Sequence, residues 1–127
     1  MGFKQGEIVL LPFPFDDLSR AKTRPALIIS SDEFNQISRT VIVVGITSNI
    51  QSGFQELNVL MEDRDIQRYP GTKPIIPSII KPYVIFAINK GLIIKKIGML
   101  TESKFNEVVI KLQKNFRNQI IRDVHIY

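Results

Sequence analysis

Short runs of β-branched and aliphatic residues, each ended by proline, glycine or polar residues, follow one another through about the first 100 positions of the chain. The runs that favour strands are 6–13, 26–30, 40–47, 55–61, 78–81 and 84–88. Between the second and third runs, the polar stretch 31–38 allows one helical turn capped by Ser31 or Asp32. Strands this short, joined by turns, favour a small barrel or a strongly bent sheet over alternating strand–helix units.

The last part of the chain has a different period. From Thr101, a suitable N-cap, apolar residues recur at helical spacing, at Phe105, Val108, Val109, Leu112, Phe116 and Ile120. Cationic residues lie off that stripe, at Lys104, Lys111, Lys114 and Arg117. We therefore expect a mainly β fold with a C-terminal helix that packs one stripe against the sheet.

Composition narrows the class of protein. The chain has 127 residues and a mass of 14.5 kDa, so we expect a single domain over residues 1–127. No apolar run approaches the roughly 20 residues that cross a bilayer, and the N-terminus lacks the pattern of a signal peptide. With no cysteine and one histidine, His125, we expect no thiolate or zinc site and no cofactor. The expected protein is soluble, cytoplasmic and not bound to a membrane.

The positive charge is concentrated in the last third of the chain. The net charge is +5; residues 1–79 hold eight Lys/Arg and nine Asp/Glu, whereas residues 80–127 hold nine Lys/Arg and three Asp/Glu. Such a basic surface attracts polyanions such as nucleic acid, although it also serves simply as a solvated face. Charge alone leaves these two interpretations open.

The stretch 12–25 interrupts the strand pattern and carries the most chemistry. We expect a loop of about ten residues within it, long for a simple hairpin and therefore a candidate functional loop. Phe13 and Phe15 could stack on unpaired bases or belong to the core, and Asp16 and Asp17 could act as a base or form the turn. Arg24 stands before a proline, as either an extended dipeptide with its charge in water or a cation fixed where an anionic substrate binds.

Four segments resemble the MazF/PemK family of toxins from bacterial type II toxin–antitoxin systems: 6–30, 41–50, 78–93 and 97–112. The opening Gly-Glu-Ile-Val, the Pro-Phe turn and the Lys-x-Arg-Pro step are the most specific of these matches. The resemblance implies an SH3-like small barrel of the MazF/CcdB type that forms a homodimer. It also implies a metal-independent endoribonuclease, an mRNA interferase cutting single-stranded RNA at short sequences, with an acidic antitoxin protein as its inhibiting partner.

The resemblance also assigns roles to single residues. Arg24 matches the family's catalytic arginine and Thr47 its catalytic threonine, with Ser48 as a neighbouring helper. In metal-free cleavage the 2′-hydroxyl attacks the phosphate and leaves a 2′,3′-cyclic phosphate and a 5′-hydroxyl. A guanidinium suits the extra charge of that transition state, because its planar fork offers paired donors to phosphate oxygens. Lys22 and Lys81 are expected to bind RNA phosphates.

The sequence departs from the family at the acid–base step. Some members place Arg and Asp where this chain has Lys81 and Tyr83, and some have a histidine in the first loop, which is absent here. A phenol, which is protonated near neutral pH, is a poor substitute for a carboxylate base. His125, two residues from the end, is interpreted as a surface residue. The general base is therefore unassigned.

Two other functions remain open for this sequence. One is a gyrase-binding toxin like CcdB, which shares the fold; against it, the chain ends in His-Ile-Tyr and has no tryptophan. The other is a barrel that binds RNA without cutting it, which the altered residues at 81 and 83 keep in consideration.

Overall fold

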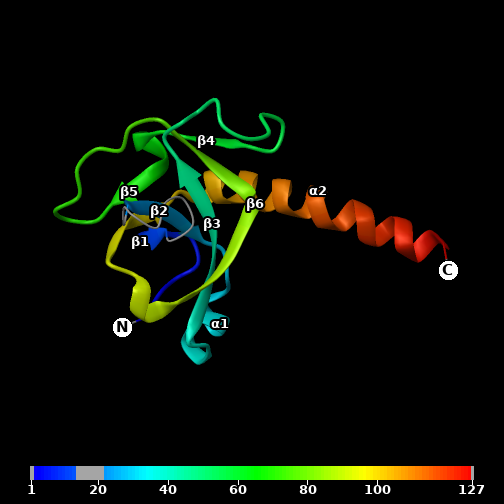
Figure 1. The fold of residues 1–127 in the computed structure, drawn as a ribbon, viewed down its shortest axis with the longest axis horizontal. Coiled ribbons are helices and arrows are strands. Elements are labelled where there is room, and N and C mark those ends of the chain that lie inside the picture. The colour runs from blue at the N-terminus through cyan, green and yellow to red at the C-terminus, as the bar shows by residue number, and fades with distance from the viewer. Residues whose placement is uncertain (1, 14–21, 127) are drawn as a thin grey trace.

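One antiparallel sheet forms the body of the protein (Figure 1). The computed structural model describes residues 2–13 and 22–126, leaving aside the side chains of 13, 22 and 117–126. Its strands are β1 Glu7–Phe13, β2 Lys22–Ile28, β3 Thr40–Thr47, β4 Val59–Met61, β5 Ile66–Arg68, β6 Ser78–Asn89 and β7 Lys95–Leu100. Its helical elements are α1 Asp32–Ile37, α2 Glu102–Ile126 and the 3₁₀ turns Asp63–Asp65 and Lys90–Leu92. The strands lie in the order β4-β6-β3-β2-β1-β7-β5.

The first hairpin is longer than the sequence predicts. Strand β2 begins at Lys22, so the predicted strand run 26–30 starts four residues too late. The reason is pairing with β1, where Leu11 lies opposite Arg24 and Phe13 lies opposite Lys22. Polar and cationic residues have weak strand preferences alone, but a ladder that is already formed extends over them. Arg24 is therefore held by a strand.

Strand β6 joins two runs that the sequence presents separately. Pro82 lies between them, yet Ser78–Asn89 is one strand. The partner register on β3 shifts between Val44, opposite Ile85, and Gly45, opposite Lys81, so the segment 82–84 forms a bulge. A proline has no N–H for a ladder, and a bulge is a position where none is needed.

Two further strands correct the sequence-based boundaries. The predicted run 55–61 is a strand only over Val59–Met61, because its first half forms turns. Strand β5, Ile66–Arg68, lies inside a stretch that is too polar to be recognised as a strand and is set by pairing with β7. The helical turn after β2 agrees with the prediction, and Ser31 is its N-cap, accepting from the Phe34 backbone N–H.

Apolar residues on the two faces of the sheet enter two separate cores. Alternate positions of one strand divide between them, as Ile8 and Val9 do on β1. The first core also includes Val108 of α2, and the second is completed by Phe3, Phe86 and Ile93. Because the central strands are covered on both faces, their sequences are continuous apolar runs and do not alternate between apolar and polar residues.

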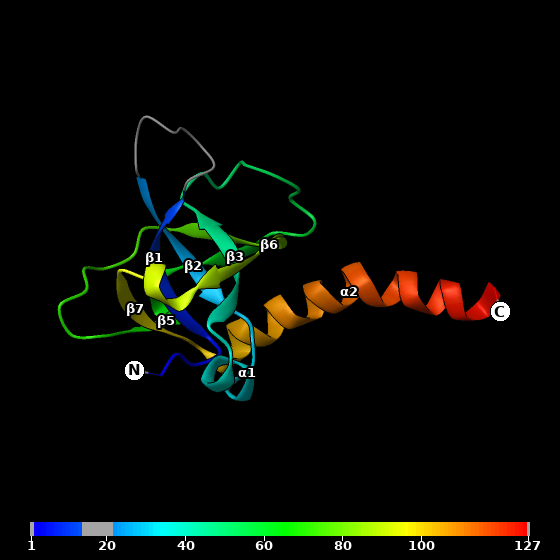
Figure 2. The ribbon, with the colours of Figure 1, turned by 60° about the horizontal axis from the view of Figure 1, so that its bottom comes forward.

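Helix α2 packs its first turns on β6 and β4 and then extends away from the sheet (Figure 1 and Figure 2). Val108 is fully buried, as predicted, but Phe116 is 50% exposed, so the prediction that it packs on the sheet is wrong. The apolar stripe continues past the edge of the body that could cover it. None of the helices within the described residues has the length and apolarity that crossing a membrane requires.

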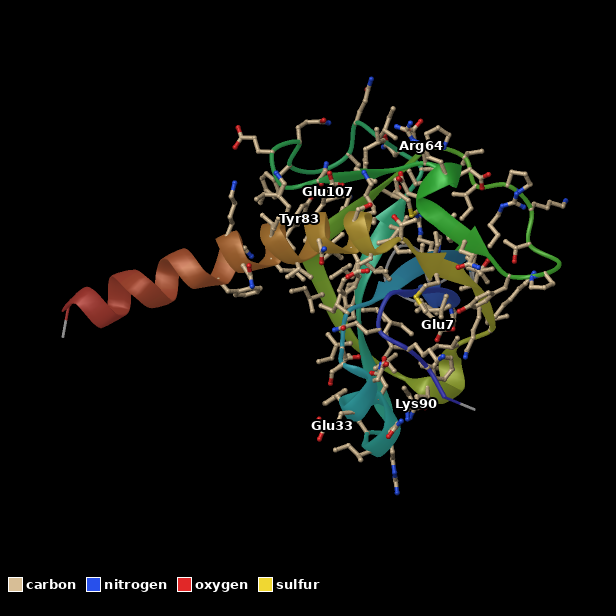
Figure 3. All side chains as sticks on the ribbon, turned by 180° about the vertical axis from the view of Figure 1, so that it is seen from behind. Glu7, Glu33, Arg64, Tyr83, Lys90 and Glu107 are labelled. Carbon is tan, nitrogen blue, oxygen red and sulfur yellow. The ribbon has the colours of Figure 1, made fainter. Side chains whose placement is uncertain are left out.

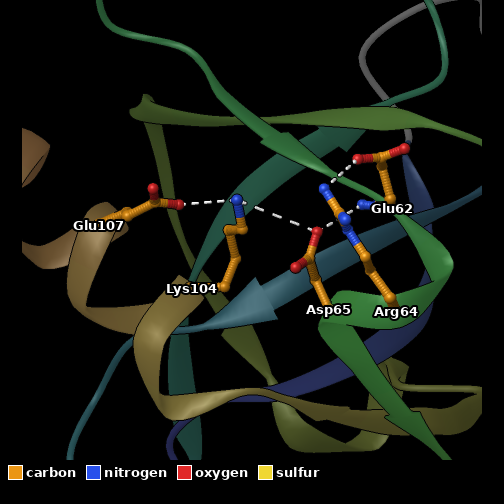
Figure 4. A network of polar contacts seen from close by, with 5 residues as sticks. All are labelled: Glu62, Arg64, Asp65, Lys104 and Glu107. Carbon is orange, nitrogen blue, oxygen red and sulfur yellow. Dashed lines mark hydrogen bonds and ion pairs between the residues drawn. The ribbon is translucent and has the colours of Figure 1, made fainter.

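Charged side chains fasten the start of α2 to the 3₁₀ turn Asp63–Asp65 (Figure 4). Lys104 Nζ lies 2.7 Å from a Glu107 carboxylate oxygen and 3.9 Å from one of Asp65. Asp65 also accepts from the backbone N–H of Glu62 at 2.8 Å. The positive charge of Lys104 is therefore partly neutralised within the protein and contributes less to a basic outer face than the sequence suggests.

Glu7, labelled in Figure 3, is a carboxylate buried at the start of β1. Its oxygens accept from the backbone N–H of Lys4 at 2.6 Å and from the Tyr69 hydroxyl at 2.8 Å. Lys96 Nζ lies 3.4 Å away and supplies the opposite charge. A buried carboxylate with these partners is compensated, whereas removal of one partner leaves a desolvated charge.

We expect Tyr69 to ionise only in strongly alkaline solution. Burial, followed by the hydrogen bond to the Glu7 carboxylate and its charge, raises the pKa of Tyr69 from 10.0 to about 12. Because this pKa is higher in the folded than in the unfolded chain, the contribution to stability is complete below pH 10 and is lost as the pH rises toward 12. Tyrosinate absorbance measured against pH should show this late ionisation in the wild type and not in Tyr69→Phe. A Tyr69→Phe curve that already falls below the wild-type curve near pH 10, where an unshifted tyrosine ionises, would contradict the assignment.

Candidate functional site

The ends of two neighbouring strands bring Arg24 and Thr47 together. Strands β2 and β3 pair with Ala26 opposite Gly45. Arg24 lies two residues before Ala26 and Thr47 two residues after Gly45, so both are at the same end of this strand pair. The two side chains with expected catalytic roles are therefore neighbours, although 22 positions separate them in the sequence.

A surface pocket of about 440 Å³ lies where these strand ends meet. Its lining residues are Thr23, Arg24, Pro25, Ile46, Thr47, Ser48, Pro74, Ile75, Ile76 and Ser78. The pocket thus has one wall from the strand ends and another from the segment 74–78. It includes three of the residues that the sequence selects as functional, Arg24, Thr47 and Ser48.

The segment 74–78 is the part of the pocket that sequence reasoning did not identify. Asp63 accepts from the backbone N–H of Ile75 at 3.0 Å and pairs with Arg68 Nε at 3.0 Å. Arg68 also donates to the carbonyl of Thr72 at 2.8 Å. These contacts fix an irregular segment in place. The sequence feature that could have drawn attention to this segment is a pair of isoleucines between two prolines, Pro74 and Pro77. In the structure the side chain of Ile76 is 65% exposed.

The Thr47 hydroxyl is oriented by the turn that follows β3. Its Oγ1 accepts from the backbone N–H of Asn49 at 3.1 Å. A hydroxyl that accepts a hydrogen bond still has its own proton to donate. Thr47 can thus present an O–H to an anionic group in the pocket, with the exposed Ser48 beside it.

Arg24 is half-buried on β2, and its Nε atom lies below the surface. The strand pairs this residue with Leu11 of β1, so the backbone that carries the guanidinium is held by the ladder. The strand therefore carries this guanidinium to the edge of the pocket. It is suited to bind an anion with paired hydrogen bonds.

Lys81 lies on the same face of the sheet as Thr47 but outside the pocket lining. It stands opposite Gly45, two residues before Thr47 on β3. Its ammonium group donates to the Ser52 hydroxyl at 2.5 Å. The structure therefore gives Lys81 a contact with the loop 48–58 that follows β3.

Tyr83, labelled in Figure 3, also contacts that loop. Its hydroxyl accepts from the backbone N–H of Phe54 at 2.9 Å and donates to Asn58 Oδ1 at 2.8 Å. A phenol that is engaged as both donor and acceptor is poorly placed to take a proton from a substrate. In this structure Tyr83 instead orders the loop 48–58 through these two hydrogen bonds.

The remaining sequence-selected residues are not described at side-chain level. Phe15, Asp16 and Asp17 lie outside the described residues, as do the side chains of Phe13, Lys22 and His125; Phe13 and Lys22 face each other across the β1–β2 ladder. Their proposed roles stay predictions. Among the described residues, no three acidic or histidine side chains gather closely enough to share a metal ion.

Residues 4–116 match the profile of a family described as PemK-like, MazF-like toxins of type II toxin–antitoxin systems. The match covers most of the chain and both walls of the pocket. No curated protein sequence matches the chain significantly.

Several solved structures share the fold at low sequence identity. An endoribonuclease in complex with its cognate antitoxin from a mycobacterial species superposes with a TM-score of 0.67 at 17% identity, over 88% of this chain and 92% of that one. The Mycobacterium tuberculosis toxin MazF-mt6 gives 0.66 at 19% identity, over 87% and 96%. A MazE–MazF structure from Deinococcus radiodurans gives 0.67 at 16% identity, over 90% and 95%. The predicted fold class, mainly β with a C-terminal helix, is confirmed.

Proposed function

Because the chain belongs to the PemK-like, MazF-like toxin family of type II toxin–antitoxin systems, we propose that it is a metal-independent endoribonuclease that cuts single-stranded RNA at short sequences. The observation that carries the proposal is the pocket in which Arg24, Thr47 and Ser48 lie together. The endoribonuclease activity named for two structurally similar mycobacterial proteins supports it.

In the proposed reaction a ribose 2′-hydroxyl of the RNA attacks the neighbouring phosphorus. The bond to the 5′-oxygen of the next nucleotide breaks, and the products end in a 2′,3′-cyclic phosphate and a 5′-hydroxyl. Arg24 donates to the non-bridging oxygens, whose negative charge grows in the transition state. Thr47 donates its O–H to the same phosphate, and Ser48 is a helper beside it. The 2′-proton passes to a general base and the leaving 5′-oxygen takes a proton from a general acid, and neither group is assigned to a residue.

The other RNA contacts of the proposal come from the surroundings of the pocket. Lys81 shares a face with Thr47 and adds positive charge there. Lys22 and the loop residues Phe13, Phe15, Asp16 and Asp17 belong to the hairpin whose end carries Arg24. They would contact RNA on either side of the cut phosphate.

We propose that the chain forms a single domain over residues 1–127. We also propose two protein partners, a second copy of this chain and an acidic antitoxin. The antitoxin complexes named for structurally similar proteins support the second partner. Sedimentation should give a dimer mass, and an acidic antitoxin peptide should compete with RNA. A sole 14.5 kDa species at micromolar concentration would exclude the homodimer. Simultaneous binding of peptide and RNA would exclude a binding site that the two share.

The test of the activity is incubation of purified protein with single-stranded RNA in the presence of EDTA. Fragments with cyclic phosphate ends are expected. Intact RNA that is retarded on a gel would instead identify a binding module without catalysis. RNA that is neither cut nor bound would reject the proposal and return attention to a gyrase-binding toxin.

We expect Thr47→Ala to lower the rate of cleavage by about tenfold or more, because a hydrogen bond to a charged group contributes about 1.5–3 kcal/mol and each 1.36 kcal/mol is a factor of ten. The matched control is Thr40→Ala at the other end of β3, which leaves the pocket intact. Single-turnover rates at saturating protein give the comparison. Equal rates for the two variants would remove Thr47 from the reaction.

A further inference from the structure

The loop 48–58 leaves the candidate pocket at Ser48 and returns to the sheet at β4. Lysines from two different elements hold it: Lys81 of β6 donates to the Ser52 hydroxyl at 2.5 Å, and Lys111 of α2 donates to the carbonyl of Glu56 at 2.6 Å. A loop with two such attachments keeps a defined shape beside the pocket.

Gly53 lets this loop approach β6 unusually closely. Its φ of +72° lies in the left-handed region that glycine favours, and a Cβ at this position would lie 1.9 Å from the Tyr83 hydroxyl oxygen. The same hydroxyl accepts from the backbone N–H of Phe54 and donates to Asn58. Tyr83 therefore holds the loop through the backbone of Phe54 and the side chain of Asn58.

Phe54 is the residue that this arrangement presents to solvent. Its side chain is 67% exposed, and its ring meets the ring of Tyr83 edge-on, with centroids 5.2 Å apart and planes at 72°. An edge-on contact supports a ring while leaving one of its faces open. Single exposed apolar residues are common on proteins, but this one has a fixed backbone and a supporting aromatic partner.

We propose that Phe54 stacks on a base of the single-stranded RNA bound at the Arg24–Thr47 pocket, with Tyr83 as its positioning residue. This inference rests on the proposed function. Unpaired bases are recognised by stacking on aromatic side chains, next to cations that contact the backbone. The loop supplies both, since Lys81 and Lys111 flank it and its neighbours Gln51 and Gln55 are exposed and polar.

Binding of two kinds of oligomer separates base stacking from charge. The probes are single-stranded 2′-O-methyl oligonucleotides, which lack the attacking hydroxyl, and abasic oligomers of the same length with the same phosphates. Phe54→Ala should bind the base-bearing oligomers about fivefold or more weakly and the abasic oligomers as the wild type does. The matched control is Ile37→Ala, which removes an apolar side chain that is 83% exposed on α1 and should change neither affinity.

A fluorescence measurement tests the contact directly. The chain has no tryptophan, so Phe54→Trp introduces a single reporter, and Ile37→Trp gives a control with one reporter elsewhere. Base-bearing oligomers should quench the first variant and not the second. An unchanged signal from Phe54→Trp in the presence of bound RNA would overturn the inference.

Tyr83→Phe tests the positioning role, because it keeps the supporting ring and removes the hydroxyl that holds the Phe54 backbone. It should lower affinity for base-bearing oligomers while sparing abasic ones, and Phe54→Tyr should retain most of the wild-type affinity.

The outcomes separate the stacking role from the proposed function. If wild-type protein binds and cuts RNA but Phe54→Ala loses affinity for base-bearing and abasic oligomers equally, the stacking role is wrong and the proposed function stands. If the wild type binds neither oligomer and leaves RNA uncut, the proposed function itself fails. Quenching of Phe54→Trp by an acidic antitoxin peptide but not by RNA would reassign the residue to protein binding.

Discussion

Arg24→Ala is expected to lower the single-turnover rate of RNA cleavage by about 10²-fold or more, while the fold and most of the RNA affinity remain. Many cations contribute to binding of the ground state, so the loss of one changes affinity only slightly. A guanidinium directed at the charge that develops on the phosphate acts mainly in the transition state, so its loss falls on the rate. The position of Arg24 in a pocket with Thr47 and Ser48 is the basis for this expectation.

Arg24→Lys should be impaired almost as severely, because lysine keeps the charge but loses the paired donors of the planar fork. The matched control is Arg39→Ala, which removes an exposed arginine from outside the pocket lining and should cut RNA at the wild-type rate. Rates, RNA dissociation constants and melting temperatures of the variants are needed together. Near-wild-type cleavage by folded Arg24→Ala would exclude Arg24 from the reaction and remove the main support for the proposed chemistry.

Gly98→Ala is expected to destabilise the protein by about 3 kcal/mol, which for a chain of this size lowers the melting temperature by about 10 °C. Gly98 lies on β7 opposite Arg68 of β5. A Cβ on Gly98 would lie 2.4 Å from the carbonyl oxygen of Gln67 and 3.0 Å from the Cα of Arg68. Both are backbone atoms, so relief requires the strands themselves to separate.

Two other glycines give graded controls for this effect. Gly45→Ala brings a Cβ 3.3 Å from a methyl group of Val84, so a small cost is expected, and Gly2→Ala meets no atom within 4 Å. Thermal unfolding should follow the order Gly98, Gly45, Gly2 in decreasing loss of stability. A Gly98→Ala protein that melts like Gly2→Ala would mean that β5 moves away from β7 at little cost. Since Arg68 of β5 helps to hold the segment 74–78, such a movement would also loosen one wall of the pocket.

The long regular elements could be predicted from the sequence because their signals are local. Strand β3 follows a continuous run of β-branched residues, and α2 follows an apolar period of helical spacing up to Val108. The short strands could not be predicted in the same way. Ile66–Arg68 is polar and only three residues long, and it is a strand because β7 lies beside it.

The candidate site likewise has a part that local sequence predicts and a part that it does not. Arg24, Thr47 and Ser48 could be selected from the sequence because an Arg-Pro step and a strand-ending Thr-Ser pair are motifs within short segments, which the family resemblance makes specific. The wall formed by 74–78 could not, because it depends on a hydrogen bond from Ile75 to Asp63, twelve residues away.

By itself, the sequence determined which residue types this protein has for chemistry and where its strong strands and helix lie, since hydrophobic period and turn residues act over a few positions. The tertiary structure decided which of these residues lie together. The pairing of β2 with β3 placed Arg24 and Thr47 at one end of the strand pair, where both line the pocket. The contact between the loop and β6 placed Tyr83, which the sequence marks as a poor substitute for a carboxylate base, against Phe54. Both outcomes depend on pairing between distant segments, whose free energy comes from packing the whole sheet and is not encoded in either segment alone.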